Sequence, residues 1–348
     1  MPLLWQELEG RKEDFLVNSF TKAFNIGFSF VFMSVLRIGN IKLKNRLFLA
    51  PMVDVTDCAF RLLCRQQGAS MVYTEMIYVD AILHENERTK KLMTIGGKED
   101  RPLGLQVTGN NLTEFTKFSK LKLLQDYDLI DINCGCPSVK ITGNEAGSYL
   151  LRTPDKIGQM IRVLKDAGHI VTAKIRLGYK NNNVLEVSKI VEKAGADLLT
   201  IHARTSEQRS SEPADWSWIT NVKKEIGIPV VGNGGVVNGE TAKKMLDIAD
   251  GAMIASAAIG NPFIFRSILN YMKTGKDGGV TKEERLSGFG EYVKFAEKYG
   301  VFEMSRAKYL GANFLKGFDG ATKARSALMA VKSKEEMNEL LKTQIRNI

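Results

Sequence analysis

The stretch IVTAKIRLGYKNNNVLEVSKIVEKAGADLLTIHAR, residues 170–204, decides the fold class. It begins with the apolar run 170–178 and ends with the apolar run 198–204, and the segment 184–196 lies between them. Near-continuous runs of Val, Ile and Leu are typical of strands that are buried on both faces of a parallel sheet. The middle segment has the apolar spacing of a helix and closes on Gly195, a common helix stop. The stretch therefore predicts a strand–helix–strand unit with parallel strands.

The same alternation continues on both sides of this unit. Apolar runs of the strand type recur along the chain at 46–52, 70–76, 102–107, 129–135, 170–178, 198–204, 229–234 and 252–258. Helical patterns lie between them, for example at 153–168 and 239–249. Eight such units predict an α/β fold, a (β/α)8 TIM barrel, which commonly takes about 250 residues as one domain. No GxGxxG or GxxxxGK[ST] motif occurs, so the dinucleotide-binding and P-loop folds lose their main support.

The pattern changes near Lys276-Asp277-Gly278-Gly279, which has the composition of a linker. From Thr281 to the C-terminus only helical patterns follow, with 13 Lys and Arg against 9 Asp and Glu. We therefore expect the barrel over residues 34–275 and a small, basic, all-helical C-terminal domain over residues 280–348.

The composition is that of an ordinary globular protein. The 348 residues are 44% hydrophobic and 25% charged, which excludes disordered and fibrous classes. Four cysteines do not make a disulfide framework in a chain of this length, so we expect a reducing, cytoplasmic location. The net charge of +10 favours a polyanionic partner.

Residues 1–33 precede the regular pattern and are expected to form an N-terminal extension of uncertain order. Their apolar run, 23–33, is shorter than the roughly 20 residues that a membrane span requires. Acidic residues between Glu7 and Asp14 exclude the basic head of a signal peptide. We therefore expect no membrane segment.

The carboxyl ends of the predicted strands are where the chemistry of such a barrel lies. Nearly every one of these ends carries a polar or charged residue, and in order the ends hold Pro51, Met52, Glu75, Met76, Gln106, Asn133, Cys134, Gly135, Cys136, Pro137, Lys174, Arg176, His202, Arg204, Asn233, Gly234, Gly235, Ala255 and Ser256. The last two strands end where these barrels hold a phosphate through bare backbone N–H groups. A phosphate-bearing ligand is therefore expected, although two ordinary tight turns would have similar sequences.

Lys174 and His202 stand on neighbouring predicted strands beside this phosphate site. A charge within an apolar run requires a partner, and both side chains can hydrogen-bond a heterocycle that gains negative charge on reduction. Gln106 can donate to and accept from an imide edge at once. A histidine in an apolar run is also common as a satisfied core residue, so this alternative stays open for His202.

Cys136 follows the fourth strand on a turn, in DINCGCPS (131–138). A thiol is mostly protonated at neutral pH and can act as a general acid. Cys134 lies two residues earlier, but no metal-ligand spacing extends from this pair and the three histidines are scattered, so no metal site is expected. The alternative for Cys136 is a small buried hydrophobic residue.

These motifs resemble the tRNA-dihydrouridine synthases, FMN-dependent enzymes that reduce selected uridines of tRNA to dihydrouridine. The resemblance runs from about Ile38 to the C-terminus and is carried in order by LAPMVDVTDCAFR (49–61), DINCGCPSVKITGNEAGSYLLRTP (131–154), TAKIRLG (172–178), TIHARTSEQRSSEPADW (200–216), VVGNGGV (230–236) and AAIGNPFIF (257–265). A further segment, SRAKYLGANFLKGFDGATKAR (305–325), is similar to the family's helical tRNA-binding domain.

The resemblance implies a role for each matching residue. The flavin ring would be lined by the backbone of Pro51, Met52 and Val53. Gln106 would hydrogen-bond the pyrimidine edge of the ring, and Lys174 and His202 would steady its negative charge after reduction. The residues implied to hold the FMN phosphate are Asn233, Gly234, Gly235, Ala255 and Ser256.

On the substrate side, the resemblance makes Cys136 the proton donor and lets Asn133 position the target base. The residues expected to contact the flipped nucleotide or other parts of the tRNA are Lys140, Arg176, Arg204, Arg306, Lys308 and Lys316. Two positions depart from the family's pattern. Ala255-Ser256 stands where the family usually has Gly-Arg, which removes a cationic phosphate contact, and Gly235 stands where an acidic residue is common.

The implied reaction uses NADPH or NADH to reduce FMN, after which hydride goes to carbon 6 of uracil and Cys136 protonates carbon 5. An FMN-dependent small-molecule oxidoreductase of the dihydroorotate dehydrogenase type would share the phosphate site without needing the basic helices. A non-catalytic RNA-binding barrel without flavin would be consistent with Ala255-Ser256. The modified uridine, the choice of nicotinamide nucleotide and the oligomeric state have no visible motif.

Overall fold

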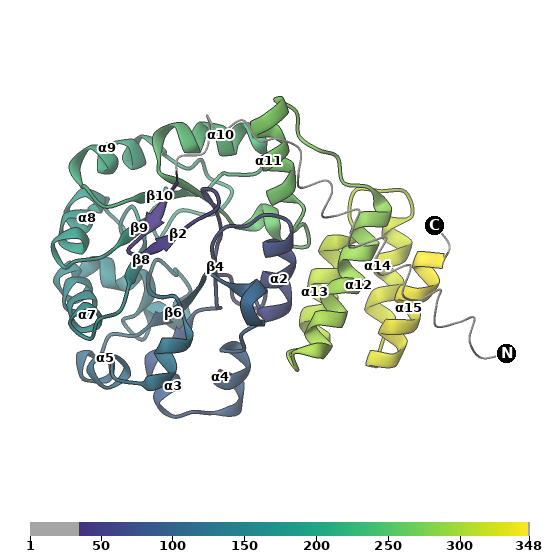
Figure 1. Ribbon diagram of the computed structural model, residues 1–348, viewed down its shortest axis with the longest axis horizontal. Coiled ribbons are helices and arrows are strands. Elements are labelled where there is room, and N and C mark those ends of the chain that lie inside the picture. The colour runs from purple at the N-terminus through teal and green to yellow at the C-terminus, as the bar shows by residue number, and fades with distance from the viewer. Residues whose placement is uncertain (1–34, 347–348) are drawn as a thin grey trace. The chain divides into compact units, whose positions relative to one another are not determined.

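The computed structural model describes residues 35–346 (Figure 1), so the predicted extension over residues 1–33 lies outside the described residues. From Val35 onward the chain forms one compact unit. It opens with a short antiparallel pair, β1 (Arg37–Ile38) and β2 (Ile41–Lys42).

The predicted parallel barrel is confirmed. Its strands are β3 (Leu47–Leu49), β4 (Val72–Tyr73), β5 (Ile77–Tyr78), β6 (Leu103–Thr108), β7 (Leu129–Cys134), β8 (Val171–Arg176), β9 (Leu198–His202), β10 (Val230–Asn233) and β11 (Gly251–Ile254). Consecutive strands pair in parallel from β6 to β11, and both β4 and β5 pair with β6, so these two occupy one barrel position. β11 pairs with β3, and a bridge between Phe48 and Met71 joins β3 to the segment before β4, which brings the barrel close to closure.

The helices that surround the strands follow from the amphipathic segments of the sequence. They are α2 (Cys58–Gln66), α3 (Val79–Leu83), α4 (Glu87–Leu92), α5 (Leu112–Phe118), α6 (Val139–Thr142), α7 (Pro154–Asp166), α8 (Val184–Lys193), α9 (Ser217–Glu225), α10 (Gly239–Ile248) and α11 (Ile264–Thr274). Short 3-10 helices are η1 (Gly97–Asp100), η2 (Lys122–Asp126), η3 (Gly147–Arg152) and η4 (Ser256–Ala258). The helices predicted at 153–168, 184–196 and 239–249 correspond to α7, α8 and α10.

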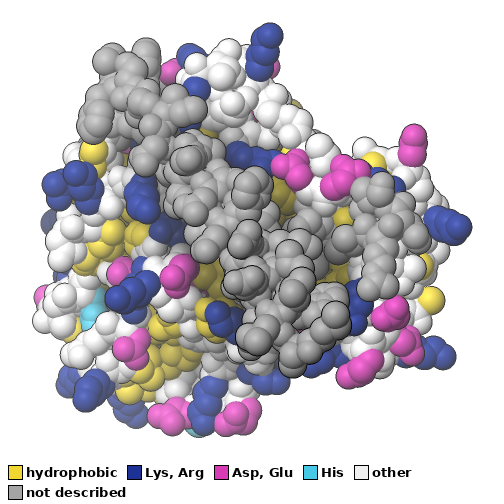
Figure 2. Space-filling view, turned by 45° about the vertical axis from the view of Figure 1, so that its right-hand side comes forward, with side chains coloured by type: hydrophobic (Ala, Val, Ile, Leu, Met, Phe, Trp, Pro, Cys, Tyr) yellow, Lys and Arg dark blue, Asp and Glu magenta, His cyan; other side chains and the backbone are white. Residues whose placement is uncertain are grey.

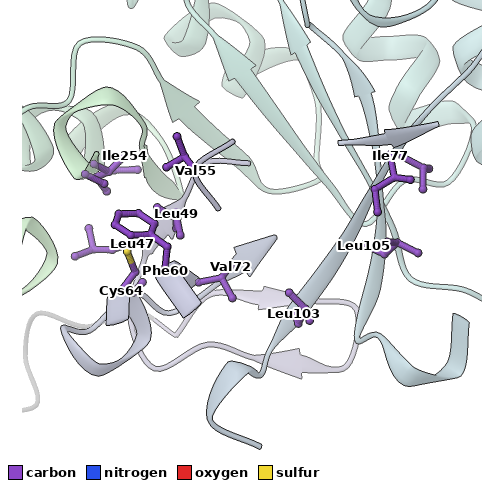
Figure 3. Close-up of a cluster of buried hydrophobic side chains, with 14 of the residues drawn as sticks. Leu47, Leu49, Val55, Phe60, Cys64, Val72, Ile77, Leu103, Leu105 and Ile254 are labelled. Atoms are coloured by element: carbon purple, nitrogen blue, oxygen red, sulfur yellow. The ribbon is translucent and has the colours of Figure 1, made fainter. Parts of the chain in front are cut away.

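The core lies between the strands and these helices. Figure 3 shows Phe60 and Cys64 of α2 close to Leu47 of β3 and Val72 of β4, and all four side chains are buried. Burial of one such large apolar side chain stabilises the fold by about 1.5–3 kcal/mol. This packing fixes α2 and the loop that precedes it, which is one wall of the site described below.

The C-terminal segment consists of helices, as predicted: α12 (Lys282–Lys298), α13 (Met304–Phe314), α14 (Ala321–Ala330) and α15 (Lys334–Arg346). Thr281 caps α12, because its side chain accepts the N–H of Glu284 while the Glu284 carboxylate accepts the N–H of Thr281. α12 packs against α2 of the barrel (Figure 1). None of the helices in the described part of the chain is long and apolar enough to cross a membrane.

Candidate active site

The register of the parallel strands brings the predicted site residues to one end of the barrel. Asn133 of β7 pairs with Lys174 of β8, Arg176 of β8 with His202 of β9, and His202 with Asn233 of β10. These residues stand at or next to the carboxyl ends of their strands, where a barrel of this type carries its active site.

Cys136 is half-buried in the loop that follows β7, and three neighbouring elements hold that loop. The Oδ1 atom of Asn133 accepts the backbone N–H of Cys136 at 2.9 Å and that of Gly135 at 3.1 Å. Arg176 of β8 donates through Nε to the Gly135 carbonyl at 2.7 Å, and Ser148 of η3 donates its N–H to the Cys136 carbonyl at 3.0 Å. The thiol therefore stands on a fixed backbone.

Gly147, the first residue of η3, sets how closely η3 approaches this loop. Its φ is +61°, a conformation that side chains rarely adopt. A Cβ at this position would stand 2.7 Å from the carbonyl oxygen of Cys136 and 2.7 Å from Cγ2 of Ile141. The close contact between η3 and the cysteine loop thus requires glycine.

A chain of buried hydrogen bonds orients the side chain of Asn133. Asn133 donates through Nδ2 to Gln106 Oε1 at 2.9 Å, and Gln106 donates through Nε2 to Asp131 Oδ2 at 2.7 Å. The side chain of Thr172 donates to the other Asp131 oxygen at 2.6 Å. Burial raises the pKa of Asp131 to about 6.

This chain differs from the expectation for Gln106, which was a direct hydrogen bond to the flavin ring. The side chain is 0% exposed, and its oxygen and nitrogen already bind Asn133 and Asp131. We therefore assign Gln106 a positioning role through Asn133. Asp131 was missed at the sequence level, although a charge within an apolar run is the same signal that singled out Lys174.

Lys174 is the cation beside the cysteine loop. It is half-buried, and its ammonium has no hydrogen-bond acceptor among the residues that the structure describes. Burial, together with nearby Arg176, lowers its pKa to about 8, while Asp131 acts in the opposite direction. An anionic ligand at this position would raise the pKa again and gain a charge-assisted hydrogen bond.

His202 is held as a neutral ring. Nη1 of Arg204 lies 3.0 Å from Nε2 of His202, and because a guanidinium only donates, Nε2 accepts and the proton is on Nδ1. Burial, with Lys174, Arg176 and Arg204 adding positive charge, lowers the pKa of His202 to about 2. The imidazole can therefore donate one hydrogen bond without carrying charge.

Arg204 differs from the expectation of a nucleotide contact. It is only 8% exposed, and besides His202 it donates through Nε to the Glu212 carbonyl at 2.7 Å. Arg204 therefore contacts the His202 ring and the backbone of the following loop. Arg176 is half-buried and likewise donates to backbone carbonyls, those of Gly135 and Thr205.

Two glycines follow β10, Gly234, which is buried, and Gly235, which is exposed. The N–H groups of Gly234 and Gly235 have no acceptor in the described part of the chain, and the same holds for Ser256 at the end of β11. Trp216 donates its indole N–H to the Gly234 carbonyl at 2.8 Å and fixes the turn. A Cβ on Gly234 would stand 2.7 Å from Cδ2 of His202, so glycine is required for the approach. Successive free N–H groups at a turn form an anion-binding concavity.

The remaining residues predicted for the cofactor lie around this concavity. Asn233 is buried and donates through Nδ2 to the Met253 carbonyl at 2.9 Å, so it ties β10 to β11. Ala255 is half-buried and Ser256 exposed. The positions after β3, which is paired with β11, are half-buried or exposed: Pro51, Met52 and Val53.

The predicted tRNA contacts differ in their surroundings. Lys140 is exposed on α6, four residues after Cys136. Lys316 is exposed and donates to the Asn313 side chain, while half-buried Lys308 donates to the Met329 carbonyl. Figure 2 shows Lys and Arg side chains distributed over the visible face, with Asp and Glu side chains among them.

Arg306 differs from its prediction as a tRNA contact. It is 7% exposed, and its guanidinium lies 3.1 Å from an Asp57 oxygen and 3.0 Å from a Glu75 oxygen. The hydroxyl of Tyr292 also donates to Asp57 at 3.0 Å. Burial raises the pKa of Glu75 to about 7, although Arg306 counteracts it. Arg306 therefore joins α13 to the barrel and is not placed to meet a phosphate.

The fold and the residues at its strand ends define an α/β-barrel enzyme with a cysteine and, among the described residues, backbone N–H groups without acceptors at the carboxyl ends of the strands. Comparison with protein families matches residues 48–348 to the description Dihydrouridine synthase (Dus). The chain therefore belongs to the dihydrouridine synthase family, and its activity is that of a tRNA-dihydrouridine synthase, an oxidoreductase.

Two curated relatives illustrate the similarity. The tRNA-dihydrouridine synthase B of Pseudomonas putida is 38% identical over 249 residues, which cover 70% of this chain and 74% of the relative. A probable tRNA-dihydrouridine synthase of Aquifex aeolicus is 33% identical over 307 residues, which cover 86% of this chain and 95% of the relative. Among solved structures, a histamine dehydrogenase from Rhizobium sp. 4-9 has a TM-score of 0.53 at 15% identity, covering 76% of this chain and 51% of that one, which supports the fold alone.

Proposed function

We propose that this chain binds FMN, accepts reducing equivalents from NADPH or NADH, and reduces uridine in tRNA with Cys136 as the proton donor. The observation that carries the proposal is the loop of Cys136. Asn133, Arg176 and Ser148 fix its backbone while the thiol stays half-buried at the end of β7. This is the arrangement that a positioned general acid requires.

The strand ends fit FMN in two respects. The free N–H groups of Gly234, Gly235 and Ser256 suit its phosphate, and they replace the cationic contact that Ala255-Ser256 lacks. Lys174 has an ammonium without a hydrogen-bond acceptor among the described residues, which suits an electron-rich ring beside it. Pro51, Met52 and Val53 follow β3, the strand that pairs with β11, so we propose that their backbone lines the flavin ring.

Each residue of the site has its own role in the proposed reaction. FMN held by these strand ends would supply the hydride chemistry at carbon 6 of uracil. Cys136 holds a proton on Sγ and delivers it to carbon 5, so the double bond between the two carbons becomes a single bond. Asn133 keeps the cysteine loop in place, and the positive charge of Lys174 stabilises negative charge on the ring. His202 adds a neutral donor at Nδ1.

The tRNA contributes the remaining partner. A uridine in folded tRNA is flipped out to reach the end of the barrel, which costs a few kcal/mol. Exposed cations such as Lys140 and Lys316 offset this cost through phosphate contacts that read no sequence.

The proposed reaction is tested under anaerobic conditions. The purified enzyme is reduced with NADPH, unmodified tRNA is added, and the absorbance of oxidised flavin is followed. We expect this absorbance to return with tRNA but not with free uridine or orotate. The Cys136→Ala variant should keep its flavin and lose this return, whereas Cys134→Ala, which alters the neighbouring thiol buried in β7, should retain it. Full activity of Cys136→Ala would refute the role of Cys136, and return of the absorbance with orotate would indicate a small-molecule oxidoreductase.

A further inference from the structure

A cavity of about 420 Å³ opens at the same end of the barrel as Cys136. Its walls come from η3 and from the loop between β8 and α8, and the lining residues are Leu151, Arg152, Tyr179, Lys180, Asn181 and Asn183. η3 is also the element whose first residues, Gly147 and Ser148, contact the backbone of Cys136. The cavity therefore adjoins the active site but does not include the residues assigned to FMN.

The cavity offers two cations and an aromatic surface. Arg152 is exposed, and its guanidinium lies 4.9 Å from the centre of the Tyr149 ring and 5.7 Å from that of Tyr179. It forms no ion pair with any carboxylate of the described residues. The Tyr149 and Tyr179 rings meet edge to face, with centroids 6.0 Å apart. Lys180 is exposed and reaches Glu207 only at 3.5 Å.

One residue of the cavity wall, Asn183, carries an acceptor without a donor. Asn183 donates through Nδ2 to the Leu151 carbonyl at 2.9 Å, which fixes the orientation of its amide. Its Oδ1 atom is buried and has no hydrogen-bond partner in the described part of the chain. A buried carbonyl oxygen without a partner costs about 1–3 kcal/mol, and a ligand N–H that reached this oxygen after a small shift of the amide would remove this cost.

Each of these groups recognises one part of a nucleotide. A guanidinium binds a phosphate through two parallel hydrogen bonds, and a lysine adds charge. Aromatic side chains stack on a base, and an amide oxygen accepts from an exocyclic amine such as that of adenine or cytosine. A fully apolar ligand would leave the Asn183 oxygen unpaired, and an anion without a base would not use the tyrosines.

We propose that this cavity is a nucleotide-binding subsite, in which Arg152 and Lys180 take the phosphate, Tyr179 stacks on the base and Asn183 Oδ1 accepts from its amino group. The inference rests on the proposed function, because that function names the molecules that could supply the nucleotide. Two sources share this chemistry, the adenosine end of the nicotinamide nucleotide and a tRNA nucleotide near the reacting uridine. Both approach from the open end of the barrel.

The experiment measures equilibrium binding to the flavin-loaded enzyme, once with NADPH and once with an unmodified tRNA transcript. Arg152→Met removes the charge of an exposed side chain, and Tyr179→Leu removes the stacking surface. The matched control is Arg162→Met, which removes an equally exposed arginine on α7. We expect Arg152→Met to raise one of the two dissociation constants by at least about 10-fold, the usual effect of losing a charge-assisted hydrogen bond, while the control changes neither.

The NADPH and tRNA measurements together identify which molecule supplies the nucleotide. A higher dissociation constant for NADPH with unchanged tRNA binding assigns the subsite to the reductant, and the reverse result assigns it to tRNA. If Arg152→Met and Tyr179→Leu bind both ligands as the wild type does, the subsite is refuted. Flavin content and reoxidation by tRNA test the proposed function separately, so a failure there is distinguishable from a failure of this cavity.

Discussion

Arg306 is the side chain through which α13 reaches the barrel, and its replacement by methionine tests how that contact is held. The guanidinium lies 3.1 Å from Asp57 and 3.0 Å from Glu75, and all three side chains are buried. Asp54 and Glu303 face the same guanidinium at 3.9 Å. Methionine keeps the apolar stem but leaves two buried carboxyl groups without their cation.

The magnitude follows from this geometry. Removing one partner of a buried ion pair costs about 3–5 kcal/mol, because the other charge stays buried and uncompensated. For a chain of this size, a loss of that order lowers the midpoint of thermal unfolding by on the order of 10 °C. A phosphate contact on the surface would instead leave the midpoint nearly unchanged.

The loss of stability in Arg306→Met depends on pH and grows as the pH rises. In the folded protein, burial raises the pKa of Glu75 from 4.5 to about 7, and burial also raises the pKa of Asp57. A carboxyl group whose pKa is raised by folding contributes stability below its unfolded pKa, and this contribution is lost as the pH rises through the folded value. Without Arg306 both values rise further. The variant should therefore resemble the wild type most closely near about pH 5 and lose most stability near about pH 8.

The assay is thermal unfolding of the flavin-loaded enzyme across that pH range, together with tRNA binding. Lys308→Met, two residues along α13, is the matched control for the unfolding midpoint alone, because Lys308 is half-buried and its one hydrogen bond within the described residues is to the Met329 carbonyl. A midpoint for Arg306→Met that equals the wild type at every pH, combined with weakened tRNA binding, would refute the buried-cluster interpretation and restore the predicted phosphate contact.

Three further predictions concern the site and its approach. Gly147→Ala places a side chain at φ +61° and 2.7 Å from the Cys136 carbonyl, and the backbone strain alone costs about 1–2 kcal/mol. Flavin should stay bound, while reoxidation of the flavin by tRNA slows about 100-fold because the cysteine loop is displaced. Single-turnover measurement of flavin absorbance would show this. Asp131→Ala leaves the Gln106 N–H and the Thr172 hydroxyl without their buried acceptor and should lower stability by about 1–3 kcal/mol in denaturant titration, together with turnover. Lys316→Ala should reduce the slope of log affinity for tRNA against log salt by about 1 without changing flavin binding, and a slope equal to that of the wild type would remove Lys316 from the interface.

The architecture was predictable because buried parallel strands and amphipathic helices have different apolar periods. Each of the eight predicted runs contains a strand, and the segment after Thr281 is helical. The order of strands around the barrel follows from consecutive pairing. Sequence reasoning also placed Cys136 and the glycines directly after predicted strands, where the structure has them after β7 and β10, while their roles stay predictions.

The partners of the polar side chains were harder to predict. Arg306 meets Asp57 across 249 positions of sequence, and no local pattern reports a contact of that range. A signal for its burial was nevertheless present, because the helical period places Arg306 on the same buried face of α13 as Leu310 and Phe314. Arg204 lies two residues beyond β9, near the predicted strand end, whereas β6 continues two residues beyond Gln106 to Thr108. Whether such a side chain points to a ligand or to another side chain depends on residues of neighbouring strands.

The position of the Arg306 cluster links two parts of the proposed function. Glu75 accepts the backbone N–H of Asp54 at 2.6 Å, and Asp57 accepts the N–H of Phe60 at 2.8 Å at the start of α2. The cluster thus holds the loop that directly follows Met52 and Val53, which are proposed to line the flavin. Because Arg306 belongs to α13, one set of ion pairs fixes both this loop, proposed to line the flavin, and a helix of the C-terminal segment that is expected to bind tRNA. Loosening the cluster should therefore weaken flavin and tRNA binding together, whereas loss of a surface lysine weakens tRNA binding alone.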